Sequence, residues 1–563
     1  MTKNIFKLLL GLLLICGTAS AQEKNSTPLF KAMQDELERN MKTLSLPDME
    51  RPFFIEYVVT EGKGYSVRAS LGSIINFSDE PFSRRCAVRV LVGSYHRTNV
   101  MNFERTLYNF GQSSTTVDDN WAQLKRDFWR LTDMSYKSAA QEYSRKMALL
   151  KQKNISPEEA GLDDFAKVKP VAKISAPNTV VSDNVKMSRL VEELSAIFKD
   201  YPEIDKSDVS IRFGSNDVFV VNSENSKYSF PNNLLMFEVT ARALIDGKNI
   251  SDKMNLTVLE DKDLPSKDEL KAKVKEFADR FVNIEKAKPI QETYSGPVLF
   301  EGLTVSTLFY LELFTGSGVF ATREPVQGTG PITLQEKMNT KVIATEYTIK
   351  SLPYLEQFEG KKVTGYFDID IEGIVPDKEL VLVENGILKN VFGSRMQTKY
   401  NKAPNGYFRV LSNANSLPAM INPGVLDIST SRGMTKDSLK QLLFKKVKEN
   451  GYKYAYICRK LDDSQLSLTA NSYPLLYLYR VNLEDGSEEL VRDAEVRDFR
   501  RGFMKTILGT SNNKMVCNLY YTFMPVTYIC PDAVLLPELE IGLKKDGQKT
   551  LAPVVQNPLK EKF

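Results

Sequence analysis

The sequence predicts an α+β fold, in which antiparallel sheets carry packed helices. A few long segments have apolar residues at helical spacing, and runs of segments that alternate apolar and polar residues follow them. Helices segregated against antiparallel sheets are typical of this order. Of the 563 residues, 42% are hydrophobic and 10% are aromatic, so the chain has the composition of a folded globular protein. This length favours two or three domains.

The first elements alternate between helical and extended patterns. Residues 28–47 predict an amphipathic helix, and residues 53–103 predict an antiparallel meander of short strands punctuated by Gly and polar residues. Residues 118–152 predict a long helix that ends in a Lys-rich turn. Residues 153–185 are rich in Pro, Lys and Asp, and we expect an extended connection there.

A second unit repeats the order of helix and then strands. It begins with a helix at residues 190–198 and closes with a charged helix at residues 266–285. The strands expected between the two helices are residues 209–213, 217–222 and 234–244. We place the main domain boundary after the charged helix, near residue 290.

The second half is predicted to be rich in strands. A strand at residues 296–302 leads into a short helix at 305–314, and residues 435–450 form a later helix. The further strands expected here are residues 363–371, 379–384 and 452–458. The domains are therefore expected at residues 22–290 and 291–563, and the first carries the extra N-terminal helix and the long helix at 118–152.

Residues 1–21 have the pattern of a secretory signal peptide. Lys3 and Lys7 precede a short apolar run, and Ala19-Ser20-Ala21 forms a cleavage signal. Cys16 offers an alternative, a lipid anchor on that thiol, although Ile15 before it is larger than lipoprotein signals prefer. No later stretch is apolar for the roughly 20 residues of a membrane helix. We therefore expect an exported protein, periplasmic or associated with the outer envelope, without a transmembrane segment.

The charge and the cysteines exclude other classes. The formal net charge is +4, and removal of the two lysines of the signal peptide leaves +2, so nothing suggests binding to nucleic acid. Four cysteines remain, and their spacing matches no zinc motif. They are either buried reduced thiols or disulfide partners; Cys517 with Cys530 would close a short loop, with Cys458 as a competitor. The four positions are Cys86, Cys458, Cys517 and Cys530.

Histidine is nearly absent, because His96 is the only one in the chain. Imidazole is the commonest metal ligand and the usual proton carrier near neutral pH, so zinc-protease chemistry of the usual kind is nearly excluded. Nucleophilic triads would depend on His96 alone. No nucleophile motif accompanies His96, and we expect a structural role or a surface contact for it.

Several segments resemble the TldD/PmbA (TldD/TldE) family. Their order and spacing match over most of the mature chain, and the signal peptide with the two additional helices resembles the exported branch of the family. The matching segments are residues 65–69, 87–93, 296–302, 367–374, 382–389, 405–409, 422–424 and 535–541. The resemblance implies the two-domain fold of that family.

The chain departs from the family at the metal motif. Active members carry H-E-x-x-x-H on the helix that follows the segment matched by residues 296–302, and its two histidines hold a metal. Tyr310, Leu311 and Thr315 stand at the His, Glu and His positions here, or Glu312 and Ser317 stand at the two His positions in a shifted register. The family's third ligand is a Cys near the C-terminus, for which Cys530 is the nearest candidate. This pattern resembles the TldE/PmbA partner subunit.

Four acidic residues are weaker candidates for a site. Glu312 is either a residual acid–base group in a groove or a helix-end residue that reaches solvent or pairs with Arg323. Asp368, Asp370 and Glu372 alternate with apolar residues and would share one strand face. That face is either a calcium or magnesium site or a solvated surface, and the resemblance implies a place near the peptide cleft.

We therefore expect an exported, metal-free, TldE-like subunit or a peptide-binding descendant of a peptidase assembly, non-catalytic on its own. Its partners would be an extended peptide and a second subunit, in a homodimer or in a heterodimer with a TldD-like chain. No cofactor is expected. Two alternatives remain: a metallopeptidase with an atypical zinc site, built from Glu312, the acidic trio or Cys530, and a non-catalytic envelope protein that only self-associates.

Overall fold

The computed structural model describes most of the chain after the expected signal peptide. The described residues are 28–101, 111–153, 159, 161–316, 318–326, 333–410, 419–462, 472–497, 499–521, 524–545, 555 and 557–560. The expected signal peptide at residues 1–21, and Cys16 within it, lie outside them. The fold is α+β, as the sequence predicts.

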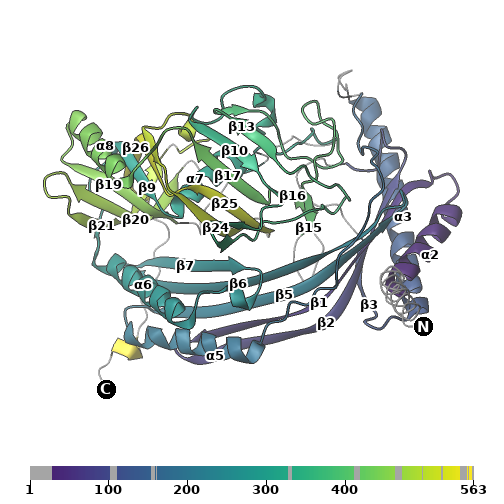
Figure 1. The fold of residues 1–563 in the computed structure, drawn as a ribbon, viewed down its shortest axis with the longest axis horizontal. Coiled ribbons are helices and arrows are strands. Elements are labelled where there is room, and N and C mark those ends of the chain that lie inside the picture. The colour runs from purple at the N-terminus through teal and green to yellow at the C-terminus, as the bar shows by residue number, and fades with distance from the viewer. Residues whose placement is uncertain are drawn as a thin grey trace, which may run out of the picture.

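A curved sheet dominates the N-terminal half (Figure 1). Two long antiparallel hairpins build it: β1 (Pro52–Ser70) with β2 (Ser73–Val92), and β5 (Lys206–Asn222) with β6 (Lys227–Ile245). β1 also pairs with β5, which joins the hairpins. The remaining strands, which lie at the edges, are β3 (Gly111–Thr115), β4 (Ala172–Ile174) and β7 (Lys248–Val258).

The long strands correct the prediction of short ones. Residues 209–213 and 217–222 are parts of β5, and the meander expected at residues 53–103 is mainly one hairpin. Gly62 and Gly64 flank an irregularity in the β1–β2 pairing and do not end the strand. A Cβ atom on Gly62 would lie 2.2 Å from the Ser215 carbonyl oxygen, so glycine permits a close approach of two backbones here.

Helices cover one face of this sheet at its two ends. α2 (Pro28–Thr43) and α3 (Trp121–Gln152) form one core with residues of β1 and β2, whereas α5 (Asn184–Ser195) and α6 (Lys267–Lys286) form another with β1, β5 and β6. Ser266 begins α6 with a capping box to Glu269. In the part of the chain that the structure describes, no helix is both long and apolar enough to cross a membrane.

The C-terminal half packs on the other, concave face (Figure 1). Val58, Ala87, Val218 and Val220 on that face share one hydrophobic core with many residues of the second half. The chain passes from α6 to the second half near residue 290, where the sequence places the boundary. The division itself stays a prediction.

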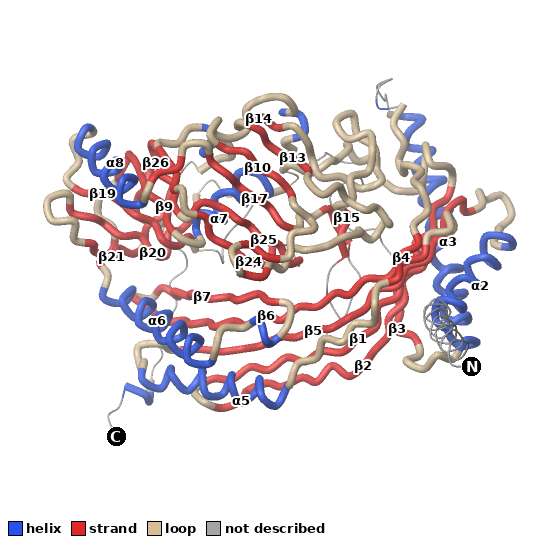
Figure 2. Tube along the Cα trace, viewed as in Figure 1, coloured by secondary structure: helices blue, strands red, loops and turns tan. Residues whose placement is uncertain are grey.

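Two sheets form the second half of the molecule (Figure 2). The nine-stranded sheet contains β8 (Lys288–Pro289), β9 (Tyr294–Glu301), β18 (Gly433–Met434), β19 (Tyr454–Leu461), β20 (Tyr473–Asn482), β21 (Glu488–Arg492), β22 (Ala494–Arg497), β23 (Gly509–Ser511) and β26 (Ala533–Leu543). The six-stranded sheet contains β10 (Tyr347–Ser351), β13 (Leu380–Glu384), β14 (Ile387–Leu388), β17 (Val425–Thr430), β24 (Lys514–Tyr521) and β25 (Met524–Pro531). The short pairs are β11 (Gln357–Phe358) with β12 (Lys361–Lys362) and β15 (Phe408–Val410) with β16 (Ala419–Ile421).

Two helices of the second half match their predicted places. α8 (Lys436–Glu449) begins after Thr435, whose side chain accepts from the N–H of Ser438. α7 (Thr304–Phe309) follows β9 and continues directly into a π-helical turn, Tyr310–Phe314. The short helix predicted at residues 305–314 is therefore an α-helix only in its first part.

The strand predicted at residues 363–371 is wrong. Residues 363–371 contain no strand, because the Asp370 carboxylate folds the segment back on itself. It accepts hydrogen bonds from the N–H groups of Glu372 and Ile374 at 2.9 Å and of Phe408 at 3.1 Å. Ile369, Asp370, Ile371 and Glu372 are all buried, so the alternation of apolar and acidic residues does not separate a buried face from an exposed one.

Candidate functional site

The π-helical turn Tyr310–Phe314 is the first candidate site. It follows α7, which packs between β9, β19 and β25 in the middle of the second half. Four of its five residues are buried. A π-turn interrupts the regular hydrogen-bond pattern of a helix and is often found at functional positions. The acidic residue in this turn, Glu312, is therefore the first candidate.

Glu312 is enclosed, with 1% of its surface exposed. Its carboxylate accepts hydrogen bonds from the N–H of Gly502, at 2.8 and 2.9 Å for the two oxygens, and from the N–H of Met504 at 3.4 Å. Burial raises the pKa of Glu312 to about 7, although these backbone donors and Arg501 favour the charged form. Glu312 does not reach solvent, and Arg323 donates to Asp164 instead of pairing with Glu312. Arg501 is the arginine whose charge acts on Glu312.

The neighbouring positions also bond within the protein. The Thr315 hydroxyl donates to the Leu311 carbonyl oxygen at 2.8 Å, and the Thr315 carbonyl accepts from the Arg501 guanidinium at 2.5 Å. Leu311 is buried and Tyr310 is partly buried. These side chains offer no nitrogen or thiolate ligand, and the Arg501 cation stands beside Thr315. The donor set therefore does not fit the zinc ion that the resemblance implies.

Cys530 lies on β25 and is fully buried. Cys517 on β24 is its neighbour across the hairpin, offset from direct register. The contact with Cys517, together with burial, raises the pKa of the Cys530 thiol well above its ordinary value. Cys86, Cys458, Cys517 and Cys530 are all free and buried, so the reduced alternative describes this structure and the disulfide expectation does not.

The acidic trio does not share a face. Asp368 is partly exposed and pairs with Lys173 at 2.5 Å, whereas Asp370 and Glu372 are each 1% exposed. The prediction of a solvated sheet face is therefore wrong for these two residues. Burial, and next the charge of Glu372, raise the pKa of Asp370 well above its ordinary value.

Glu372 joins the two halves of the molecule. Its carboxylate accepts from Arg89 on β2 at 3.0 Å and from the N–H of Arg395 at 2.7 Å. Arg89 also donates to Glu56 on β1 at 2.9 Å. Across the described ranges, no three His, Cys, Asp or Glu side chains are grouped so as to hold a metal ion.

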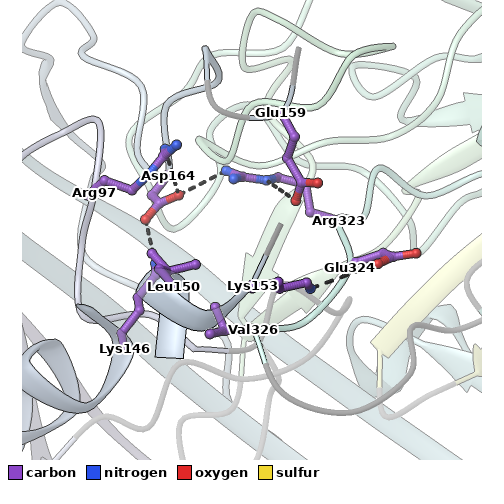
Figure 3. Close-up of a pocket in the computed structure, with 9 residues that line it drawn as sticks. All are labelled: Arg97, Lys146, Leu150, Lys153, Glu159, Asp164, Arg323, Glu324 and Val326. Carbon is purple, nitrogen blue, oxygen red and sulfur yellow. Dashed lines mark hydrogen bonds and ion pairs between the residues drawn. The ribbon is translucent and has the colours of Figure 1, made fainter. Parts of the chain in front are cut away.

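A second ionic cluster at the junction was not predicted from the sequence. Figure 3 shows Arg97, Lys146 and Arg323 converging on Asp164 at a small pocket. The Asp164 carboxylate pairs with Lys146 at 2.5 Å and with Arg323 at 2.9 Å, and it accepts a hydrogen bond from the N–H of Thr98 at 2.9 Å. Burial lowers the pKa of Lys146 to about 8. The only sequence signal was an isolated Lys within the buried stripe of the long helix.

His96 lies at the surface, as expected. Its side chain is 48% exposed, and Nδ1 is 3.1 Å from the Asp163 carboxylate. The nearby Ser94 hydroxyl accepts from the N–H of Arg97. The contact with Asp163 indicates a local surface role for His96.

Comparisons with known proteins agree on the fold. Residues 293–447 match the PmbA/TldA metallopeptidase C-terminal domain. A Thermotoga maritima protein described as a modulator of a DNA gyrase has 14% sequence identity and a TM-score of 0.57, covering 87% of this chain and 96% of its own. TldE from Thermococcus kodakarensis has 12% identity and a TM-score of 0.56, covering 91% and 100%.

A third solved structure, of a Bacteroides thetaiotaomicron protein described as a modulator of DNA gyrase, has 13% identity and a TM-score of 0.55, covering 91% of this chain and 98% of its own. At these identities the structural likeness shows the fold alone. No curated protein sequence matches the chain significantly.

Proposed function

We propose that this chain, whose residues 293–447 match the PmbA/TldA metallopeptidase C-terminal domain, is a metal-free, TldE-like subunit of the TldD/PmbA family that binds extended peptide. The observation that carries the proposal is the closed state of the turn Tyr310–Phe314. Glu312 and Thr315 are bonded to Gly502 and Arg501, at the positions where the family resemblance expects the metal motif. We further propose that the protein is exported, from the pattern of residues 1–21.

Glu312 is the strongest argument for the alternative, an atypical catalytic site. A pKa of about 7 suits a general acid–base group. Two features weigh against it, because the carboxylate is enclosed and both of its oxygens accept backbone hydrogen bonds. A catalytic carboxyl must reach a substrate proton, so we favour a structural role for Glu312.

Peptide binding by strand addition needs few specific side chains, because main-chain hydrogen bonds supply the affinity. A metal-free subunit retains this ability. In an assembly it would enclose and hold the peptide that its partner subunit cleaves. The partner would carry H-E-x-x-x-H, or a second copy of this chain would take its place in a homodimer. The buried connection between Arg89 and Glu372 keeps the two halves of such a subunit in a fixed relation.

Metal analysis tests the proposal. Residues 22–563 are purified alone and after co-expression with a TldD-like chain that carries H-E-x-x-x-H, and zinc and peptide cleavage are measured in both samples. We expect no stoichiometric zinc in the chain alone, and zinc with cleavage in the pair. About one zinc per chain in the protein alone would overturn the proposal, and Glu312→Gln and Cys530→Ala would then identify the ligands.

A further inference from the structure

A hollow of about 440 Å³ opens to solvent where the first half of the chain passes into the second. Residues 288–294 form one wall, and residues 451–453 with strands β19, β20 and β21 form the rest. Neither the turn Tyr310–Phe314 nor the acidic segment, residues 368–372, contributes to it. The hollow is therefore separate from the residues considered above.

Tyrosines line this hollow. Tyr454 and Tyr456 occupy alternate positions on β19 and so belong to one face of the strand. Tyr452, which precedes the strand, also lines the hollow. The ring of Tyr294 lies 4.9 Å from that of Tyr452 and 4.7 Å from that of Tyr456, measured between centroids. The Tyr294 hydroxyl donates to the Pro297 carbonyl oxygen at 2.7 Å, which fixes the ring at the centre of this tyrosine cluster.

A polar row adjoins the rings. Arg480 on β20 stands opposite Tyr456, and Glu489 on β21 stands opposite Arg480. Arg480 donates to the Glu489 carboxylate at 2.5 Å, and its guanidinium carbon lies 4.7 Å from the centroid of the Tyr454 ring. The Nε atom of Arg480 is buried and has no hydrogen-bond partner among the described residues. Planar donors and acceptors are thus held in fixed positions beside aromatic faces.

This lining selects against two common classes of ligand. A hydrocarbon ligand favours predominantly apolar walls, whereas the aliphatic residues here are few: Pro289, Ile290 and Val491. A phosphate ligand favours unpaired cations or a helix N-terminus, whereas Arg480 is already paired with Glu489 and only Lys288 and Lys453 remain at the rim.

From this juxtaposition of tyrosine faces and a fixed Arg–Glu pair, we propose that the hollow binds a saccharide. A pyranose ring has C–H groups on its faces and hydroxyl groups around its edge. The faces pack on aromatic rings, which combine an apolar body with a polar tip, and the edge hydroxyls exchange hydrogen bonds with guanidinium, carboxylate and tyrosine groups. Tyr454 is 40% exposed and supplies the accessible ring. This site is independent of the proposed peptide role.

Saturation-transfer NMR with three disaccharides tests the proposal on the full mature chain. The probes are diacetylchitobiose, cellobiose and maltose, each titrated separately. We expect saturable binding of at least one, with a Kd of about 1 mM, which is the affinity of a small, solvent-open site. Tyr454→Ala is expected to weaken that binding by about tenfold or more, because a central aromatic contact is lost.

Tyr479→Ala is the matched control. Tyr479 neighbours Arg480 on β20, so it faces the other side of the sheet, and it carries a comparable cation contact, with Arg459 at 4.6 Å. The control is expected to bind the disaccharide as the native protein does. The proposal is overturned if none of the three probes binds saturably, or if the two variants lose binding equally. Retention of full affinity by Tyr454→Ala would also overturn it.

Discussion

The guanidinium of Arg89 on β2 donates to the carboxylate of Glu372 at 3.0 Å, and this contact joins two segments 283 residues apart in the chain. The side chains are 3% and 0% exposed. Arg89 also lies over the Phe165 ring at 5.0 Å and donates to Glu56. Because both ions are shielded from water, removal of one would leave the other buried without its charge partner.

Arg89→Ala is therefore expected to lower the free energy of unfolding by about 3–5 kcal/mol, the range for breaking a buried ion pair. Urea denaturation at neutral pH measures it. The matched control is Lys137→Ala, which removes an exposed pair with Asp133 at 2.7 Å and should cost less than about 0.5 kcal/mol. Equal losses in the two variants would contradict a stabilising role for the contact between the halves.

Glu312 predicts a pH dependence of stability. Its pKa is about 7 in the folded protein and 4.5 ordinarily, so between these values the folded chain keeps a proton that the unfolded chain releases. The free energy of unfolding contributed by this group therefore falls as pH rises through the window, by at most about 1.4 kcal/mol per pH unit, and is constant above it.

Glu312→Gln removes this titration. The stability of the variant relative to the native protein should accordingly rise as pH increases from 4.5 to about 7. Denaturant titrations across that window measure the difference, and Glu384→Gln, at an exposed carboxylate, serves as the control. A difference that does not change with pH would show that Glu312 does not titrate in this window.

The four thiols of residues 22–563 are expected to resist modification. Burial raises the pKa of Cys86 and of Cys458 to about 12, and the thiolate is the reactive form. A chromogenic disulfide reagent should therefore detect no thiol in the native protein and all four in denaturant. Fewer than four in denaturant without reductant would indicate a disulfide, with Cys517 and Cys530 as the first pair to examine.

The helices were predictable because each depends on a local pattern. The long helix expected at residues 118–152 is Trp121–Gln152, and the helix expected at 435–450 is Lys436–Glu449. Strand lengths were less predictable, because glycine in a strand and glycine in a turn look the same in sequence. Gly62 and Gly64 lie within β1 only because another backbone approaches them.

The acidic segment shows why site residues are harder to predict. Alternation suggested that Asp368, Asp370 and Glu372 share a face, but Asp370 bonds to three backbone N–H groups and Glu372 meets Arg89 from the other half. Phe408 and Arg89 are distant in sequence from these carboxylates, and no local pattern encodes their contacts. The burial of Glu312 likewise depends on Gly502 and Met504.

The edge of β2 predicts a contact with another chain. Among the described strands, β3 pairs only with residues 84–88 of β2, which leaves residues 73–83 with β1 alone. Ile75 and Phe77 are 51% and 46% exposed on this edge, and an exposed apolar edge strand favours pairing. Phe77→Lys should weaken subunit association in sedimentation experiments, whereas Trp129→Lys, at a 48% exposed position on α3, should not.

Gly373 allows the acidic segment to pack against the curved sheet. Replacing Gly373 with alanine tests how much this packing contributes to stability. Its φ is +77°, and an added Cβ would lie 3.1 Å from the Tyr228 ring, whose hydroxyl donates to the Ile371 carbonyl oxygen at 2.9 Å. Gly360 has the same φ of +77° with nothing within 4 Å. Alanine at either position destabilises the fold by about 1–2 kcal/mol, because the backbone there is left-handed. Only Gly373→Ala also displaces Tyr228. We expect Gly373→Ala to be the more destabilising by about 1 kcal/mol or more in urea denaturation, and equal losses would show that the contact with Tyr228 contributes nothing.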